Sequence, residues 1–193
     1  MAILVMASPV HAERADRNAP MNIEADALVY DDASRTSTFT GNVVITKGSI
    51  VMRGRRVVVR QDEQGNQFGS IEGDSNAQGL FRQKREGLDE WIEGRGDRIE
   101  YDSQKNTVRL LGGASLRRYL GTRLNDEAQG GVIVYNSVTE VFSVEGGAGG
   151  RTAENPSGRV RAMLTPGPGD AQTPPSEAPA ELRPSTRMEE TRP

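Results

Sequence analysis

The sequence predicts an all-β protein, an elongated antiparallel β-jellyroll or half-pipe of about a dozen or more short strands, built from repeats. Three observations predict this fold class. A motif recurs along the chain, apolar and polar residues alternate through its middle, and helical periodicity is nearly absent. A chain of 193 residues has room for one such domain with extensions at its ends.

The repeated motif joins an aspartate and a Tyr-Asp pair to a later glycine. It runs from Asp26 to Gly41 and again from Asp97 to Gly112, 71 residues further on. Weaker copies finish at Gly73 and Gly146, so glycines that we expect to end strands recur every 32 to 39 residues. A fixed interval indicates one small unit stacked on copies of itself. Such a unit buries its apolar face only against its neighbours.

The strands are predicted from a period of two. Alternation of this kind places the apolar residues on one face of a sheet. Polar turn segments separate the strands, which favours an antiparallel meander whose apolar faces meet in two facing sheets or a rolled half-pipe. The alternating segments are residues 38–46, 50–53, 56–60, 107–110 and 141–145, and the turns are residues 31–34, 47–48, 63–66, 103–106 and 136–137.

Both ends of the stack are predicted to be edge strands, at residues 21–26 and 159–164. Edge strands carry unpaired backbone groups, and no helix is predicted to cap either end. Open ends of this kind favour head-to-tail pairing with another copy or a related module. The alternative is that the charged side chains of Glu24, Arg159 and Arg161 merely blunt the edges.

The terminal segments are expected to lie outside the fold. Residues 1–12 contain a short apolar run at 2–7 and end in small or compact residues at 10–12, which is typical of a signal peptide. The missing charged start leaves open whether this signal peptide is truncated. The run is much shorter than the roughly 20 residues of a membrane span. We expect a flexible N-terminus at 13–20, the β-domain at 21–164 and a disordered Pro-rich tail at 165–193.

Composition narrows the chemistry. The chain has no Cys, and its single His, His11, lies in the predicted signal peptide. The expected mature chain therefore lacks thiol nucleophiles, imidazole bases and the usual ligands of transition metals apart from carboxylates. We therefore expect no enzyme, no cofactor and no metal. The net charge of −3 does not fit a nucleic-acid partner. A carboxylate-dependent polysaccharide-degrading enzyme remains as an alternative, with Asp26, Glu93, Asp97 and Glu100 as candidates.

Residues 21–26, the Tyr30-Asp31 pair and residues 38–43 and 57–59 resemble the LptA-type lipopolysaccharide-transport proteins of the OstA-like β-jellyroll superfamily. The resemblance covers roughly residues 20–164. It implies a periplasmic carrier that binds the lipid A part of lipopolysaccharide inside the roll. It also implies copies that stack end to end as a bridge between inner-membrane LptC-like and outer-membrane LptD-like jellyroll domains.

The predicted lipid site is the apolar face of the strands. Each acyl CH₂ removed from water contributes roughly 0.8 kcal/mol, so an apolar groove could hold a lipid without covalent chemistry. The alternative is an ordinary packed core in a structural or adhesive module. The resemblance implies acyl contacts for Met21, Ile23 and Phe81. The predicted groove comprises Met21, Ile23, Tyr30, Phe39, Val43, Ile45, Met52, Val57, Val59, Phe81, Ile99, Leu110, Leu116, Phe142 and Val144.

Two arginine clusters could meet lipid phosphates through paired hydrogen bonds. They are Arg53, Arg55, Arg56 and Arg60, and the adjacent Arg117 and Arg118. A solvated strand face is the favoured interpretation, so these residues are not part of the predicted site.

Overall fold

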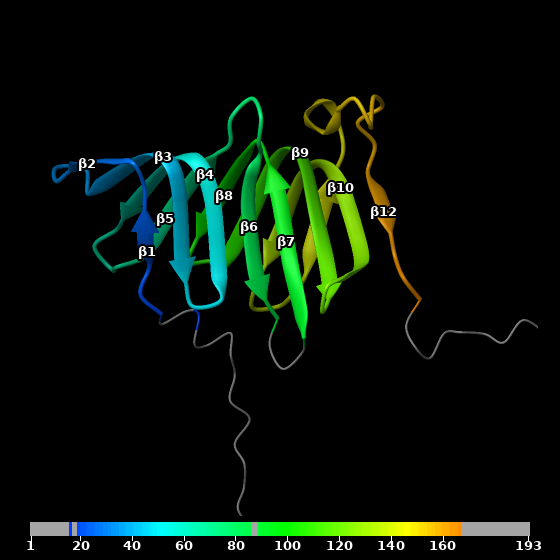
Figure 1. The fold of residues 1–193 in the computed structure, drawn as a ribbon, viewed down its shortest axis with the longest axis horizontal. Helices are drawn as coiled ribbons and strands as arrows, with labels where there is room; N and C mark the ends of the chain where they lie inside the picture. Colours follow the sequence, from blue (N-terminus) through cyan, green and yellow to red (C-terminus); the bar gives the residue numbers. More distant parts are fainter. Residues whose placement is uncertain (1–15, 17–18, 86–88, 167–193) are drawn as a thin grey trace, which may run out of the picture.

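The computed structural model describes residues 16, 19–85 and 89–166 and shows one antiparallel sheet of twelve strands (Figure 1). The all-β prediction is confirmed. The predicted signal peptide and nearly all of the predicted tail lie outside the described residues. The strands are β1 (Asn22–Glu24), β2 (Ala27–Asp31), β3 (Thr36–Lys47), β4 (Ile50–Gln61), β5 (Gln67–Glu72), β6 (Gly79–Lys84), β7 (Glu90–Gly96), β8 (Arg98–Asp102), β9 (Thr107–Leu120), β10 (Arg123–Asn136), β11 (Phe142–Glu145) and β12 (Arg161–Met163).

The sheet folds over into two layers because four strands are long enough to belong to both. β3, β4, β9 and β10 have 12 or 14 residues each, which is longer than the short strands that the sequence predicted. The front layer orders as β1, β3, β4, β6, β7, β9, β10 and β12. The back layer orders as β2, β3, β4, β5, β8, β9, β10 and β11. Figure 1 shows the front layer with β1 at one end and β12 at the other.

Glycines form the crease where the long strands pass from one layer to the other. Gly41 in β3 and Gly112 in β9 have φ of +78° and +74°, a conformation that glycine adopts without steric cost. The N–H groups of Asp26 and Asp97 donate to the carbonyls of these two glycines at 3.0 Å. The repeated Asp–Gly motif is therefore the joint of the crease. The expectation that Gly41 and Gly112 end strands was wrong, because the bulge bends each strand without stopping it.

Two further crease positions need glycine because strands approach closely. A Cβ on Gly54 of β4 would lie 2.5 Å from Ile71 Cγ2 and 2.7 Å from the Glu72 carbonyl oxygen of β5. A Cβ on Gly130 of β10 would meet Val144 Cγ1 at 2.6 Å and the Glu145 carbonyl oxygen at 2.7 Å in β11. The same kind of contact thus recurs in the N-terminal and the C-terminal half of the roll.

The core lies between the layers and is tightly filled in the middle of the roll. Phe81, Met52 and Ile45 are each 1% exposed, and Ile71 and Leu110 are fully buried. The apolar side chains are less tightly packed at the two ends of the roll. At the N-terminal end Leu28 and Tyr30 of β2 are exposed, and at the C-terminal end Phe142 and Leu164 are exposed. The predicted edge strands are confirmed as β1 and β12, with β2 and β11 beside them in the back layer.

Two residues of the expected terminal extensions are attached to the roll. Asp16 is buried and accepts hydrogen bonds from the Ser49 N–H at 2.6 Å and from Gln83 Nε2 at 3.1 Å. Thr165 donates its N–H to Asp126 at 2.9 Å. Contacts with the roll therefore extend beyond both ends of the predicted 21–164 domain, to Asp16 before it and to Thr165 after it.

Replacing Gly54 by alanine tests the crease. We expect a loss of about 1–3 kcal/mol in the free energy of unfolding, because the added methyl overlaps Ile71 and the backbone of β5. Gly69→Ala in β5 is the matched control, since its nearest atom would be 3.6 Å away; it should gain about 0.5 kcal/mol. Urea unfolding measures both, and equal stabilities of the two variants would contradict the crease.

Candidate ligand-binding cavity

The interior of the roll is hollow at its C-terminal end. A cavity of about 590 Å³ lies there between the two layers, within the range of roughly 300–1,000 Å³ found for ligand pockets. We call it the C-terminal cavity. Its front wall comes from Ile92, Leu116, Ala128, Val160, Ala162 and Leu164, and its back wall from Tyr135, Phe142 and Val144.

The cavity exists because the last strands contribute little to packing. Ala128 and Ala162 face each other across β10 and β12, and neither reaches far into the space between the layers. The packed core begins behind Tyr135, whose ring centroid lies 6.4 Å from that of Phe81. The end of the roll is therefore an apolar chamber, closed on its inner side by aromatic rings.

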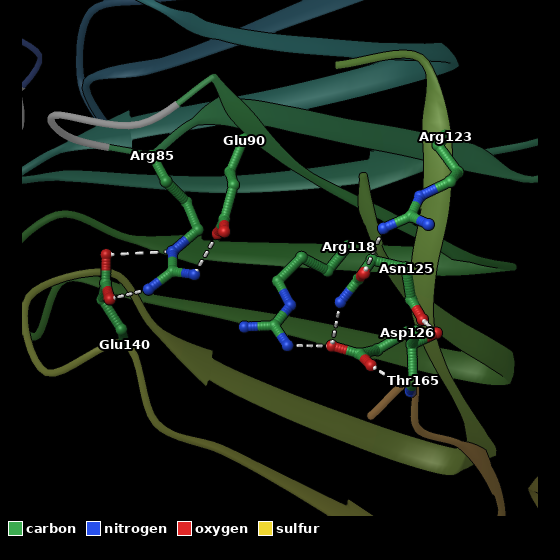
Figure 2. Close-up of polar contacts among 8 residues, drawn as sticks. All are labelled: Arg85, Glu90, Arg118, Arg123, Asn125, Asp126, Glu140 and Thr165. Carbon is green, nitrogen blue, oxygen red and sulfur yellow. Dashed lines mark hydrogen bonds and ion pairs between the residues drawn. The ribbon is translucent and has the colours of Figure 1, made fainter. Parts of the chain in front are cut away.

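An ion pair points into this chamber from the front layer. Arg118 lies two residues after Leu116 on β9, and Asp126 lies two residues before Ala128 on β10, so strand alternation places both on the inner face. Arg118 forms an ion pair with Asp126, as Figure 2 shows. Burial opposes ionisation of Asp126, but hydrogen bonds from the Thr165 N–H and from Arg118 outweigh it and lower the pKa of this carboxyl.

A second group of charges joins the two layers at the mouth of the cavity. Arg85 follows β6 in the front layer, and Glu140 precedes β11 in the back layer. Arg85 Nε donates to Glu140 Oε1 at 3.1 Å, and its two other nitrogens bind Glu140 and Glu90 (Figure 2). Hydrogen bonding to Glu140 raises the pKa of Arg85, which keeps the guanidinium charged.

The structure distributes the predicted groove among several environments. Leu116, Phe142 and Val144 line the C-terminal cavity, and Tyr30 is exposed at the opposite end. The others belong to the packed core, where Val43, Ile45, Met52, Val57, Phe81, Ile99 and Leu110 are buried. Met21, Ile23, Phe39 and Val59 lie partly buried against this core. Three members of the predicted groove thus come together in the cavity, and lipid binding by the full set stays a prediction.

Sequence reasoning missed several cavity residues. Ile92, Tyr135 and Ala162 were not in the predicted groove, and Arg118 was assigned to a solvated face. The signal for Arg118 was available, because it has the same strand parity as Leu116. The other arginine cluster lies outside the roll, with Arg55 and Arg56 near Asp74 and Glu72.

The candidate carboxylates of the enzyme alternative each have a structural partner. Glu93 pairs with Arg95 and Glu100 with Arg109. Asp26 and Asp97 occupy equivalent joints of the crease. Within residues 16, 19–85 and 89–166, no group of three or more His, Asp or Glu side chains is placed to hold a metal ion. In the same part of the chain, no helix is long and apolar enough to cross a membrane.

A family model described as "LptA/(LptD N-terminal domain) LPS transport protein" matches residues 22–141. The chain belongs to this family. The "Lipopolysaccharide export system protein LptA" of Haemophilus influenzae is 29% identical over 168 residues, which cover 86% of this chain and 89% of that protein. The LptA of Escherichia coli K12 is 30% identical over 119 residues, 61% of this chain and 62% of that protein.

A solved LptA-type structure has the same fold. The crystal structure of LptH, described as "the LptA homologous periplasmic component of the conserved lipopolysaccharide transport device from Pseudomonas aeruginosa", matches with a TM-score of 0.67 and 26% identity. The match covers 79% of this chain and 99% of the LptH chain. The resemblance to the LptA-type, OstA-like family is thereby confirmed, and so is its jellyroll.

Asp126→Asn tests how this LptA-family roll holds its last strand. The variant should be about 1–3 kcal/mol less stable at pH 7, because a charged acceptor for Arg118 and Thr165 is lost. Folding lowers the pKa of Asp126. The stability that its ionised carboxylate adds is therefore complete above its ordinary pKa of about 3.9, and it is lost as the pH falls through the folded-state pKa. Urea unfolding should show a smaller difference in unfolding free energy between wild type and Asp126→Asn at pH 3 than at pH 7. An equal difference at the two pH values would contradict this role.

Proposed function

We propose that this protein is a periplasmic carrier of lipopolysaccharide. It shelters lipid A acyl chains inside the roll, leaves the sugar-phosphate headgroup in water at the open side, and assembles head to tail into a bridge from the inner to the outer membrane. The observation that carries the proposal is the C-terminal cavity, an apolar space of about 590 Å³ at the end of an LptA-family jellyroll.

The cavity suits hydrocarbon chains. Its walls are mostly aliphatic and aromatic side chains. Its charged residues are held in ion pairs, Arg118 with Asp126 on the inner face of the front layer and Arg85 with Glu140 at the mouth. Each CH₂ moved from water into such a space contributes roughly 0.8 kcal/mol, so a chain of several carbons binds without a polar anchor. A site that holds its ligand by apolar contact alone also allows the ligand to slide onward.

The ends of the roll support pairing between copies. Leu28 is 56% exposed on β2, at one back-layer edge, and Phe142 is 45% exposed on β11, at the other. A second copy placed end to end would cover both side chains and pair the free backbone of the edge strands. Jellyroll domains of the LptC-like and LptD-like type would use the same ends.

Filling the cavity should block lipid capture. Ala162 lines the cavity from β12, so Ala162→Trp should lower the fraction of protein that retains lipid A at least about tenfold, because the indole occupies the space of an acyl chain. Met163→Trp on the outer face of β12 is the matched control and should capture normally. Native mass spectrometry after incubation with lipid A gives the readout, and normal capture by Ala162→Trp would contradict the proposal.

The direction of assembly can be tested with two variants that each lose one end. Leu28→Asp and Phe142→Asp should each weaken self-association at least about tenfold, because burial of one apolar side chain contributes about 1.5–3 kcal/mol. Mixed together, they should form a dimer through the one intact head and the one intact tail. Sedimentation velocity measures both. Self-association of either single variant as strong as that of the wild type, or no dimer in the mixture, would contradict head-to-tail pairing.

A structural or adhesive module is the second candidate function. The filled centre of the roll, where Phe81 is 1% exposed, favours it because no chain can lie there without movement of the layers. Lipid A capture separates the two candidates, since a permanently packed module retains none.

A further inference from the structure

The side of the roll opposite the crease is an open seam, where turns of the front layer face turns of the back layer. The Arg85–Glu140 pair crosses this seam between residues 55 apart in sequence. Every other ion pair among residues 16, 19–85 and 89–166 joins neighbours within one layer or at the crease. Arg85 therefore makes the ion pair between the layers, and a weaker hydrogen bond from Lys47 Nζ to Gln67 Oε1 at 3.4 Å joins them nearer the N-terminal end.

The contact is built to be specific. Glu140 meets Arg85 with both carboxylate oxygens, one of them at 3.1 Å from Nε. Such paired hydrogen bonds are the strong and directional form of an arginine–carboxylate contact. The Arg85 side chain is only 17% exposed, and Glu140 has φ of +56°, which a non-glycine residue adopts only when its surroundings hold it there.

The pair also stands at the mouth of the C-terminal cavity, since Arg85, Thr139 and Glu140 all line it. Separating Arg85 from Glu140 would free the two layers to part beside the cavity. The glycine crease on the opposite side supplies the hinge, because Gly41 and Gly112 already carry the bend of β3 and β9.

Glu140 is the exchangeable partner of Arg85. Glu90 also binds Arg85, from the adjacent strand of the same layer, and its side chain is as buried as that of Arg85, at 17% exposure. Glu140 is more accessible at 37%. A phosphate monoester offers three acceptor oxygens and a charge of about −1.5 to −2 at pH 7, more than one carboxylate supplies. Glu90 would keep the guanidinium in place during the exchange.

We propose that Arg85 and Glu140 form a latch on the seam, and that a phosphate group of the ligand opens it by taking the place of Glu140 on Arg85. This inference rests on the proposed function and adds to it the route of loading. The ligand class is a phosphorylated amphiphile whose acyl chains pass between the parted layers into the C-terminal cavity while its phosphate stays on Arg85.

Two substitutions separate the latch from the phosphate site. Glu140→Gln releases the latch and keeps Arg85, so phosphorylated lipid A should load about tenfold faster, the factor expected for loss of a charge-assisted hydrogen bond. Arg85→Gln removes both functions, so it should load phosphorylated and enzymatically dephosphorylated lipid A at equal rates. The wild type should prefer the phosphorylated form. Arg109→Gln, which breaks an ion pair on the back layer, is the matched control and should behave as wild type.

The movement itself can be measured because the chain has no Cys. Nitroxide labels on Asp89→Cys and Val138→Cys report the distance across the seam by electron spin resonance. That distance should widen in Glu140→Gln without lipid, and in the wild type with phosphorylated lipid A. Melting curves of each variant confirm folding.

The outcomes are distinct. Lipid A capture by the wild type, with unchanged loading rates in Glu140→Gln and Arg85→Gln, overturns the latch and leaves the carrier function standing. An unchanged seam distance in Glu140→Gln also overturns the latch. Absence of capture by the wild type and by every variant overturns both proposals.

Discussion

The close approach of backbones at the glycine crease is the constraint on which the structure depends. Four strands must turn from one layer into the other without losing their partners, and they do so at glycines. A Cβ would overlap the next strand in β4 and β10, and the side chain of the joint aspartate in β3 and β9. Once the crease is formed, alternation along each strand delivers apolar residues to the inside of both layers. The two-layered core and the seam opposite the crease both depend on these glycines.

Much of this arrangement could be predicted from the sequence. Alternation predicted the strands, and the recurrence of Asp26 and Gly41 in Asp97 and Gly112 predicted stacked units. What the glycines do could not be predicted, because a glycine with positive φ serves equally to reverse a chain or to bend it. The choice depends on a distant partner, here the N–H of an aspartate 15 residues away in each unit, which holds the bent strand in the sheet.

The cavity was harder to foresee than the fold. A period of two assigns a residue to the inside of the roll but does not say whether anything fills the space opposite. Val43 and Val144 have the same pattern, yet the first is buried in the core and the second lines the cavity. The difference comes from the short last strand and the small side chains of Ala128 and Ala162. For Arg118, the strand parity correctly indicated the inside of the roll, but its charge led to the prediction of a solvated face.

The position of the cavity has a consequence for a row of copies. It lies at one end of the roll and is open where Phe142 and Leu164 are exposed, whereas the facing end of a following copy would present Leu28 and Tyr30 of β2. In the proposed head-to-tail assembly, the cavity of one molecule would be closed by the N-terminal end of the next copy. In such a filament each interface between two copies would close one cavity. The amount of lipid held would therefore increase with filament length and would be lost when the copies dissociate.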